Sequence, residues 1–357
     1  MNFLLSAEQL EIQDTIARYL ADTCDSVILH REIESPSWQS QSVWQGLCEL
    51  GISAIGIPEA YDGLGMEMID CAVVAEELGR AAAPTPYFGH TLCAMAIAEL
   101  GSDQQKQAWL PRLASGEVLG TVALAEGNGS WQPDQWQLVG GDTLSGEKTF
   151  VPFAEHAGVM VVGTAGGQLM LVTPDGAHTA FSAVAGIDQT RKTSSVTFSD
   201  SPAEKLGAAH QGDRLRDAAL VLLAADAYGG ATRALSMTVD YANVREQFGQ
   251  PIGKFQGLKH QLANIAVEIE PARGLYWYAA HAFDHIVDDS PRAAALAKAH
   301  LGDRYLQAAR DCVEAHGGIG YTWEYDLQIF VKRAMFDFAY LGNPACHRKR
   351  VATLNGW

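Results

Sequence analysis

The sequence predicts an α+β protein in which a sheet-forming segment separates two helical segments. Apolar residues recur every three to four positions in the first third of the chain and again towards its C-terminus, and short β-branched runs broken by turn residues lie between them. The 357 residues, of which 48% are hydrophobic, can bury a core spread over two or three packed units. We place the domains at residues 1–116, 117–209 and 210–357.

The first segment shows a helical repeat. Ile12, Ile16 and Leu20 alternate with acidic residues, and the range 72–78 repeats the three-to-four spacing. This spacing places apolar side chains on one face of a helix, which packs against a core. We therefore expect helices to dominate from about residue 6 to residue 115.

The middle segment consists of short runs rich in Val, Leu, Thr and Met, separated by Gly and Asp. Runs of this length and composition are typical of strands. The pattern predicts a small antiparallel domain. The expected strands cover residues 120–124, 136–142, 158–162, 169–172 and 194–198.

Long helical patterns return after residue 213. Residues 218–227 are almost continuously Ala, Leu and Val, as expected of a helix that is buried on most sides. This long helix ends at Arg245, and a turn at 247–253 precedes a second helix that begins near Phe255.

The corner at Arg245 permits two interpretations. An arginine with an aromatic residue three positions later, Phe248, suits a ligand that is anionic at one end and planar at the other. The same residues suit a corner in which Phe248 fills the core and Arg245 caps helix carbonyls. Chemistry alone leaves the two interpretations even.

Composition excludes several function classes. The formal charge of −17 argues against nucleic-acid binding, which needs clustered Lys and Arg. The start of the chain lacks a basic region followed by a long apolar run, and no later stretch is apolar enough to span a bilayer, so we expect a soluble cytoplasmic protein. The six cysteines lack C-x-x-C spacing and are interpreted as reduced thiols, mostly in the core.

Common catalytic motifs do not occur in the sequence. No dinucleotide-binding glycine fingerprint follows a strand, and neither a P-loop nor a serine nucleophile elbow is found. His281 and His285 lie four positions apart beside Asp284, a spacing that could place two metal ligands on one helix face. Without an H-E-x-x-H motif we favour a solvated helix edge and expect no metal.

Two motifs near the C-terminus carry a family resemblance. The run at 245–250 (REQFGQ), followed by Gln256, and the run at 316–321 (HGGIGY) together resemble the flavin-binding signature of the acyl-CoA dehydrogenase family. Blocks at 57–65 and 144–151 are similar to other parts of the family, so the resemblance covers nearly the whole chain. It implies an N-terminal helical domain, a middle antiparallel β-domain and a C-terminal four-helix bundle, with FAD between the last two.

The resemblance also assigns cofactor contacts. It implies that Arg245 and Phe248 meet the pyrophosphate and adenine of an FAD bound by a neighbouring subunit, and that Gln256 makes a further contact. Gly318 matches the glycine that lets the backbone approach the cofactor, while Glu314 stands where the family usually has glutamine. In the middle domain, Phe150 and Pro152 replace a Trp and a Thr that many members place at the flavin.

The family reaction needs a base that this sequence lacks at the usual positions. Oxidation of an acyl thioester removes the α-proton while a hydride passes from the β-carbon to the flavin, and a carboxylate normally takes the proton. The resemblance places that carboxylate at Leu341, or in a minority of members at Ala219, and neither residue accepts a proton. Asp337, about one helical turn before Leu341, is the best replacement candidate.

We therefore expect an FAD-dependent acyl-CoA dehydrogenase subunit that lacks the catalytic glutamate. Resemblance to bacterial α2β2 enzymes implies a glutamate-bearing paralogue as partner, a bulky steroid-like acyl-CoA as substrate and an electron-transferring flavoprotein as acceptor. One alternative is a self-sufficient homo-oligomeric flavoenzyme of the same fold, with a non-standard base or with oxygen-dependent or reductive chemistry. Another is a non-catalytic scaffold that has lost FAD.

Overall fold

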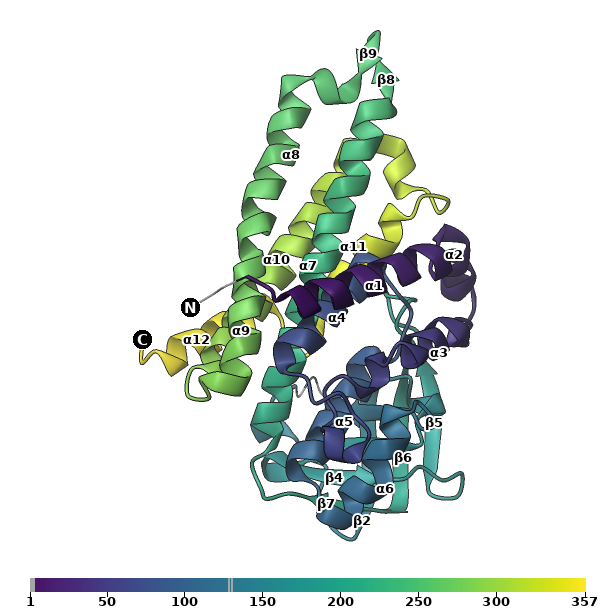
Figure 1. The fold of residues 1–357 in the computed structure, drawn as a ribbon, viewed down its shortest axis with the longest axis vertical. Coiled ribbons are helices and arrows are strands. Elements are labelled where there is room, and N and C mark those ends of the chain that lie inside the picture. Colours follow the sequence, from purple (N-terminus) through teal and green to yellow (C-terminus); the bar gives the residue numbers. More distant parts are fainter. Residues whose placement is uncertain (1–3, 128, 130) are drawn as a thin grey trace.

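The structure, a computed structural model, describes residues 4–127, 129 and 131–357. Helices come first, a β-domain lies in the middle, and helices return at the end, as predicted (Figure 1). The helices of the first part are α1 (Ala7–Thr23), α2 (Ser26–Glu34), α3 (Gln41–Glu49), α4 (Met68–Arg80), α5 (Tyr87–Leu100) and α6 (Asp103–Ala114).

Local sequence signals explain where these helices begin. Helix α1 starts with a capping box, in which the Ser6 hydroxyl accepts from the Gln9 amide and the Gln9 side chain accepts from the Ser6 amide. Ile16 and Leu20 on the same helix are buried, which confirms the predicted apolar face. Helix α6 begins with the same motif at Ser102.

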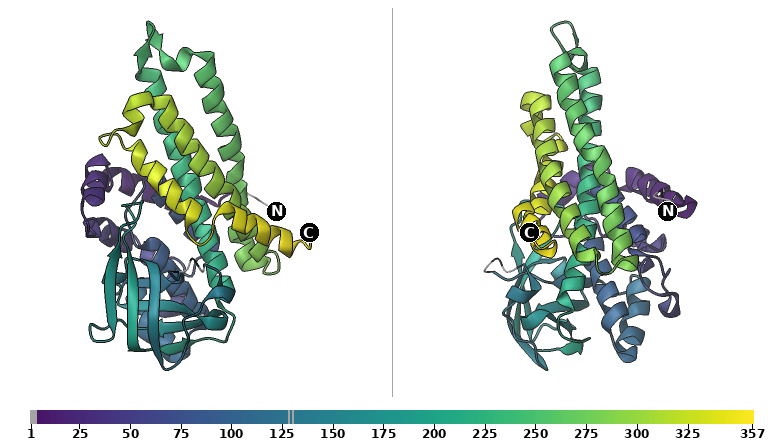
Figure 2. Two further views of the ribbon diagram at one scale, coloured as in Figure 1. Left: turned by 180° about the vertical axis from the view of Figure 1, so that it is seen from behind. Right: turned by 90° about the vertical axis from the view of Figure 1, so that its left-hand side faces the viewer.

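The described part of the middle domain contains two sheets, with strand orders β1-β3-β4-β7 and β2-β6-β5 (Figure 2). Apolar residues from both sheets and from α5 and α6 fill the space between these elements. The strands are β1 (Gly120–Ala123), β2 (Thr143–Pro152), β3 (Val159–Thr164), β4 (Gln168–Val172), β5 (Thr179–Val184), β6 (Thr193–Pro202) and β7 (Glu204–Leu206).

One pairing departs from the predicted antiparallel domain. Strands β1 and β3 pair in parallel, from Gly120 opposite Val159 to Ala123 opposite Val162, whereas the other strand pairs of this domain are antiparallel. The chain crosses to the second sheet to form β2 before it returns as β3. Such a crossover connection lets β3 run in the same direction as β1.

The predicted strand at 136–142 is wrong. Trp136 and Leu138 are buried, as in a strand, but the segment has no ladder partner. Its backbone donors go elsewhere, because the Glu126 carboxylate accepts the amides of Gln137 and Leu138 at 2.9 to 3.1 Å. A buried carboxylate therefore replaces the neighbouring strand.

The C-terminal domain is helical, and α7, α10, α11 and the consecutive α8 and α9 pack alongside one another (Figures 1 and 2). Helix α7 ends at Val244 and α8 begins at Gln256, which confirms the predicted corner. Between them, β8 (Glu246–Gln247) and β9 (Gln250–Pro251) form a hairpin at the top of Figure 1. The helices are α7 (Gly212–Val244), α8 (Gln256–Ile269), α9 (Arg273–His285), α10 (Ser290–His316), α11 (Leu327–Ala339) and α12 (Pro344–Leu354).

Two expectations about the whole chain bear on this fold. Within the described residues, no helix is both long and apolar enough to cross a membrane. Residues 1–3, which belong to the segment examined above for a secretory signal, lie outside the described part. The cysteines are free, and Cys24, Cys71, Cys93 and Cys312 are buried. Cys48 and Cys346 are partly exposed.

Helices α4 and α7 pack backbone to backbone through two glycines. A Cβ atom at Gly229 would lie 1.9 Å from the Glu76 carbonyl oxygen, and one at Gly79 would lie 2.2 Å from the Asp226 carbonyl oxygen. Both positions are buried on their helices. The sequence must therefore keep glycine at these two positions for the helices to approach.

We predict that Gly229→Ala lowers the free energy of unfolding by about 1–3 kcal/mol or more, because the added methyl group forces α4 and α7 apart. Urea denaturation followed by circular dichroism measures the change. Gly274→Ala on α9 is the matched control, since a Cβ atom there meets nothing within 4 Å. It should be neutral or stabilising by about 0.5–1 kcal/mol; equal midpoints for both variants would contradict the predicted close contact.

Candidate functional site

The hairpin at the end of α7 presents an aromatic side chain to solvent. Phe248 is 93% exposed and has a backbone φ of 52°, and the following Gly249 has a φ of 79°. Residues other than glycine rarely adopt this left-handed backbone conformation. Large apolar side chains are rarely so exposed without a ligand or partner to cover them. The interpretation in which Phe248 fills the core of this chain is therefore wrong.

The other residues assigned by the resemblance lie at the same end of the domain. Arg245, at the C-cap of α7, and Gln256, the first residue of α8, are exposed. Glu314 in the last turn of α10 and Gly318 just after it are also exposed. A Cβ atom at Gly318 would meet nothing within 4 Å, so its backbone is open to approach.

An aromatic stack joins the ends of α7 and α10. The Tyr241 ring stacks on the His316 ring with centroids 4.4 Å apart, and the Tyr241 hydroxyl donates to the His316 carbonyl at 3.4 Å. Tyr241 lies one turn before Arg245, and His316 lies between Glu314 and Gly318. The structure thus brings the two sequence motifs, about seventy residues apart, to one end of the domain.

Aromatic side chains of the middle domain and the helical domain contact one another just beyond the end of α11. The Tyr340 hydroxyl, beyond the end of α11, donates to the Phe150 carbonyl at 3.2 Å. The Trp131 ring lies against both, with centroid distances of 5.7 Å to Phe150 and 5.4 Å to Tyr340. Phe336 stacks on the other side of Tyr340 at 4.7 Å.

These contacts do not fit a flavin bound by this chain. A flat ring held between two walls needs about 3.5 Å of space on each face, or roughly 7 Å from wall to wall. Phe150 and Tyr340, which come from the two sides of the family flavin site, are instead joined directly by a hydrogen bond. Pro152, where many members have a threonine, has no side-chain donor to offer.

Leu341 is buried and tightly held. Its φ is 58°, and its carbonyl accepts from His347 Nε2 at 3.1 Å. Lys298 Nζ donates to the next carbonyl, that of Gly342, at 3.3 Å. Burial, together with the nearby cations Lys298, Arg350 and Arg216, lowers the pKa of His347 to about 3, so this imidazole is neutral at pH 7.

Asp337 belongs to an ion cluster and does not face a cavity as a free base. Its carboxylate contacts Arg191, which also binds Asp226 at 2.7 Å, and Arg333 binds Asp226 at 2.5 Å. Asp337 is fully buried, and this burial raises the pKa of its carboxyl group despite the opposing effect of Arg191. A base must reach the proton that it removes, and this side chain is enclosed.

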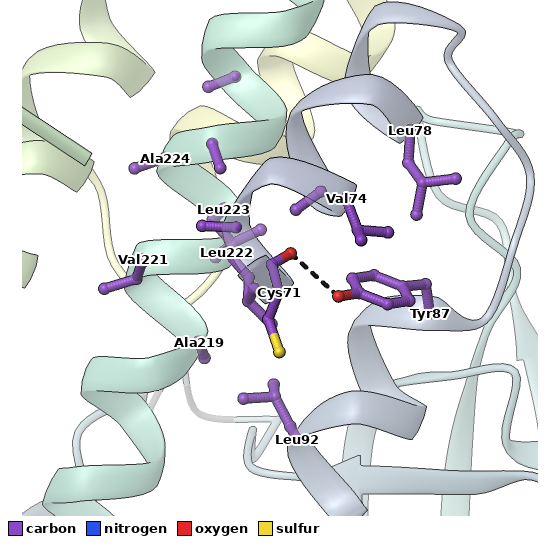
Figure 3. Close-up of a cluster of buried hydrophobic side chains, with 14 of the residues drawn as sticks. Cys71, Val74, Leu78, Tyr87, Leu92, Ala219, Val221, Leu222, Leu223 and Ala224 are labelled. Carbon is purple, nitrogen blue, oxygen red and sulfur yellow. Dashed lines mark hydrogen bonds between the residues drawn. The ribbon is translucent and has the colours of Figure 1, made fainter. Parts of the chain in front are cut away.

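The alternative base position also lies in a packed region. Ala219 sits in an apolar cluster formed by α4, α5 and α7 (Figure 3). In the same cluster the Tyr87 hydroxyl donates to the Cys71 carbonyl at 2.9 Å. Leu341 and Ala219, the two positions that the resemblance assigns to the base, are both buried in this structure.

The ion cluster was missed by reasoning from the sequence. Arg191 and Asp226 lie in different domains, so their contact leaves no local pattern. A usable signal was the presence of Asp226 and Arg333 in otherwise apolar helices, because buried charges usually require partners. No comparable sequence pattern indicated that Trp131 would contact Phe150 and Tyr340.

The histidine pair on α9 is a surface feature. His285 Nε2 lies 2.9 Å from the Glu67 carboxylate, and the His281 ring lies 4.6 Å from the His285 ring. Within the described part of the chain, no group of three His, Cys, Asp or Glu side chains is placed to hold a metal ion.

Comparison with known proteins identifies the family. The model of the acyl-CoA dehydrogenase N-terminal domain matches residues 6–117, and that of the acyl-CoA dehydrogenase C-terminal domain matches residues 218–354. The chain is 33% identical to acyl-CoA dehydrogenase IpdE2 of Mycobacterium tuberculosis over 94% of both proteins. It therefore belongs to the acyl-CoA dehydrogenase family, whose members bind FAD.

Two further relatives support this assignment. IpdE2 of Mycolicibacterium smegmatis is 33% identical over 97% of this chain and 98% of that protein. A solved structure described as a Tcur3481-Tcur3483 steroid acyl-CoA dehydrogenase variant is 30% identical over 98% of both chains, with a TM-score of 0.91. These values show that the three-domain fold is shared along the whole chain.

We predict that His347 makes stability fall with decreasing pH. Because its folded-state pKa of about 3 lies below its ordinary value of 6.5, the unfolded chain binds a proton first. The stabilisation is complete above pH 6.5 and is lost towards pH 3, with a loss of about 2 kcal/mol at pH 5. Urea midpoints at pH 5 and pH 7.5 should differ less in His347→Gln than in the parent.

The matched control is His260→Gln on α8, which replaces an exposed histidine. This variant should keep the full pH dependence of the parent. An unchanged pH dependence in His347→Gln would contradict the neutral, buried state of His347.

Proposed function

We propose that this chain is the subunit of a heteromeric acyl-CoA dehydrogenase that lacks the catalytic base and completes the flavin site of a glutamate-bearing partner. One asymmetry carries the proposal. The residues that match contacts to a neighbouring subunit's FAD are exposed, whereas Phe150 and Tyr340, which match the region of this chain's own flavin, contact each other directly.

The exposed residues at the ends of α7 and α10 fit a dinucleotide that is held by another subunit. The Arg245 guanidinium can pair with the pyrophosphate through two hydrogen bonds, and the Phe248 ring offers a flat apolar surface to the adenine. The open backbone at Gly318 lets the cofactor approach α10 closely. A neighbouring cofactor would also account for the exposure of Phe248.

In this proposal, the chain contributes neither the hydride acceptor nor the base of the reaction. FAD held by the partner supplies the hydride acceptor for oxidation of the acyl thioester. This chain orients the pyrophosphate and adenine, while the glutamate of the partner takes the α-proton. Leu341, Ala219 and the enclosed Asp337 supply no proton acceptor of their own.

The relatives guide the choice of substrate and partner. One structure that the chain resembles is described as a steroid enzyme and names two gene products. We therefore propose a bulky, steroid-like acyl-CoA as substrate and a paralogue as partner, with an electron-transferring flavoprotein as electron acceptor. Leu341 and Ala219 support the choice of partner, because a subunit without a carboxylate at the base position needs a partner that has one.

We predict that the chain isolated from its own cells occurs as a complex with a homologue bearing the glutamate, at one FAD per pair. Native mass spectrometry measures the partner and the FAD count together. The purified chain alone should neither retain FAD nor oxidise an acyl-CoA. Leu341→Glu alone should not restore activity, because the missing base is only one of two defects.

A homo-oligomer with one FAD per chain would overturn the proposal and favour a self-sufficient flavoenzyme. A complex whose FAD content does not depend on this chain would instead favour a scaffold.

We predict that Arg245→Ala weakens retention of FAD by the complex about 10- to 100-fold, because a hydrogen-bonded charge is lost at the pyrophosphate. Titration of released FAD by fluorescence measures the effect. Arg245→Lys should fall between Ala and the parent, since it keeps the charge without the planar fork. Arg18→Ala, at an exposed arginine on α1, is the control and should retain FAD fully; equal retention in both alanine variants would count against the proposal.

A further inference from the structure

A surface groove lies beside the hairpin, and no part of the proposed flavin contact uses it. Its volume is about 550 Å³, and it runs between the C-terminal turns of α7 and the segment that leads into α11. Helix α2 closes one end, where the Ser26 hydroxyl donates to Asp326 at 2.6 Å. Its lining includes Arg233, Asp240, Tyr241, Val244, Glu324 and Tyr325.

The floor of the groove is aromatic, and its rings contact one another. The Tyr241 and Tyr325 rings meet edge to face with centroids 6.3 Å apart. His316 lies against both, and its Nε2 is 3.2 Å from the Tyr325 hydroxyl. This floor is preformed, so a partner would not have to order it on binding.

The rim of the groove is acidic. Asp240, Glu324 and Asp326 contribute three carboxylates, against one guanidinium from Arg233. Asp326 is engaged by Ser26 and by His30 at 2.9 Å. Asp240 and Glu324 make no ion pair within the described part of the chain, so their charges are available to a partner.

The groove is continuous with the residues assigned to the partner's FAD. Val244 lines the groove, is 76% exposed and directly precedes Arg245. Tyr241 lines the groove, and the His316 ring on which it stacks lies between Glu314 and Gly318 in the chain. A subunit whose cofactor reaches Arg245 therefore approaches the groove as well.

We propose that this groove receives a lysine or arginine side chain of the partner dehydrogenase subunit and thereby selects that partner over a second copy of this chain. A cation above tyrosine rings and between carboxylates gains both cation–π and charge attraction. A second copy brings 42 acidic against 25 basic residues, so like charges oppose self-association at an acidic groove. This inference rests on the proposed function, and it names the contact that determines which subunit binds this chain.

The test is charge reversal in the complex of the two subunits. Asp240→Lys/Glu324→Lys should weaken assembly at least tenfold, measured by native mass spectrometry over a dilution series with the partner identified by its peptides. Asp142→Lys/Glu147→Lys on the exposed face of the middle domain changes the net charge equally and should leave assembly unchanged. Circular dichroism of each isolated variant checks that the fold is kept.

Two further variants test which sign of charge the groove binds. The neutral variant Asp240→Asn/Glu324→Gln should weaken assembly less than charge reversal, and raised salt should reduce the difference. Arg233→Glu should leave assembly unchanged or strengthen it; a loss equal to that of the lysine variant would show that the groove receives an acidic group and would overturn the inference.

The outcomes separate this inference from the proposed function. If charge reversal leaves the heteromer intact while Arg245→Ala still releases FAD, the groove has no role in partner choice and the proposed function stands. If the parent chain forms a homo-oligomer with one FAD per chain, the proposed function fails, and the choice of partner inferred here fails with it.

Discussion

The structure depends above all on one buried ion cluster, formed by Arg191, Asp226, Arg333 and Asp337. Arg191 comes from the middle domain, Asp226 from α7, and Arg333 and Asp337 from α11, so the cluster joins the middle domain to two helices of the C-terminal domain. Burying charges is costly unless each finds a partner, and removing one member of such a group typically costs about 3–5 kcal/mol. The orientation of α11 against the middle domain therefore depends on these four side chains.

The same ion cluster also accounts for the aromatic contact between the two domains. Because Arg191 holds α11 at Asp337, the residues just beyond this helix lie against the middle domain, where Tyr340 meets Phe150 and Trp131. The family resemblance assigns the flavin and the base to the region that holds this charged cluster and this aromatic contact. The ion cluster and the aromatic contact thus order the same interface between the two domains.

The end of the C-terminal domain that carries the hairpin has exposed apolar side chains instead of a buried contact. Phe248 and Val244 are largely exposed, and a charged groove with an aromatic floor lies beside them. An isolated molecule gains nothing from this arrangement, whereas a partner subunit would cover the apolar side chains and meet the acidic rim. These exposed side chains and the groove support the proposal that a partner subunit contacts this end of the domain.

The sequence by itself determined the order of helical and sheet segments, the corner after Val244 and the absence of a carboxylate at Leu341 and Ala219. These are local properties, since periodicity and side-chain identity are written in consecutive residues. Only the tertiary structure decided that β1 and β3 run in parallel, that Asp337 is paired and that Tyr340 contacts Phe150. Tyr340 and Phe150 are 190 positions apart, and a contact over that separation follows from packing, which no local pattern records.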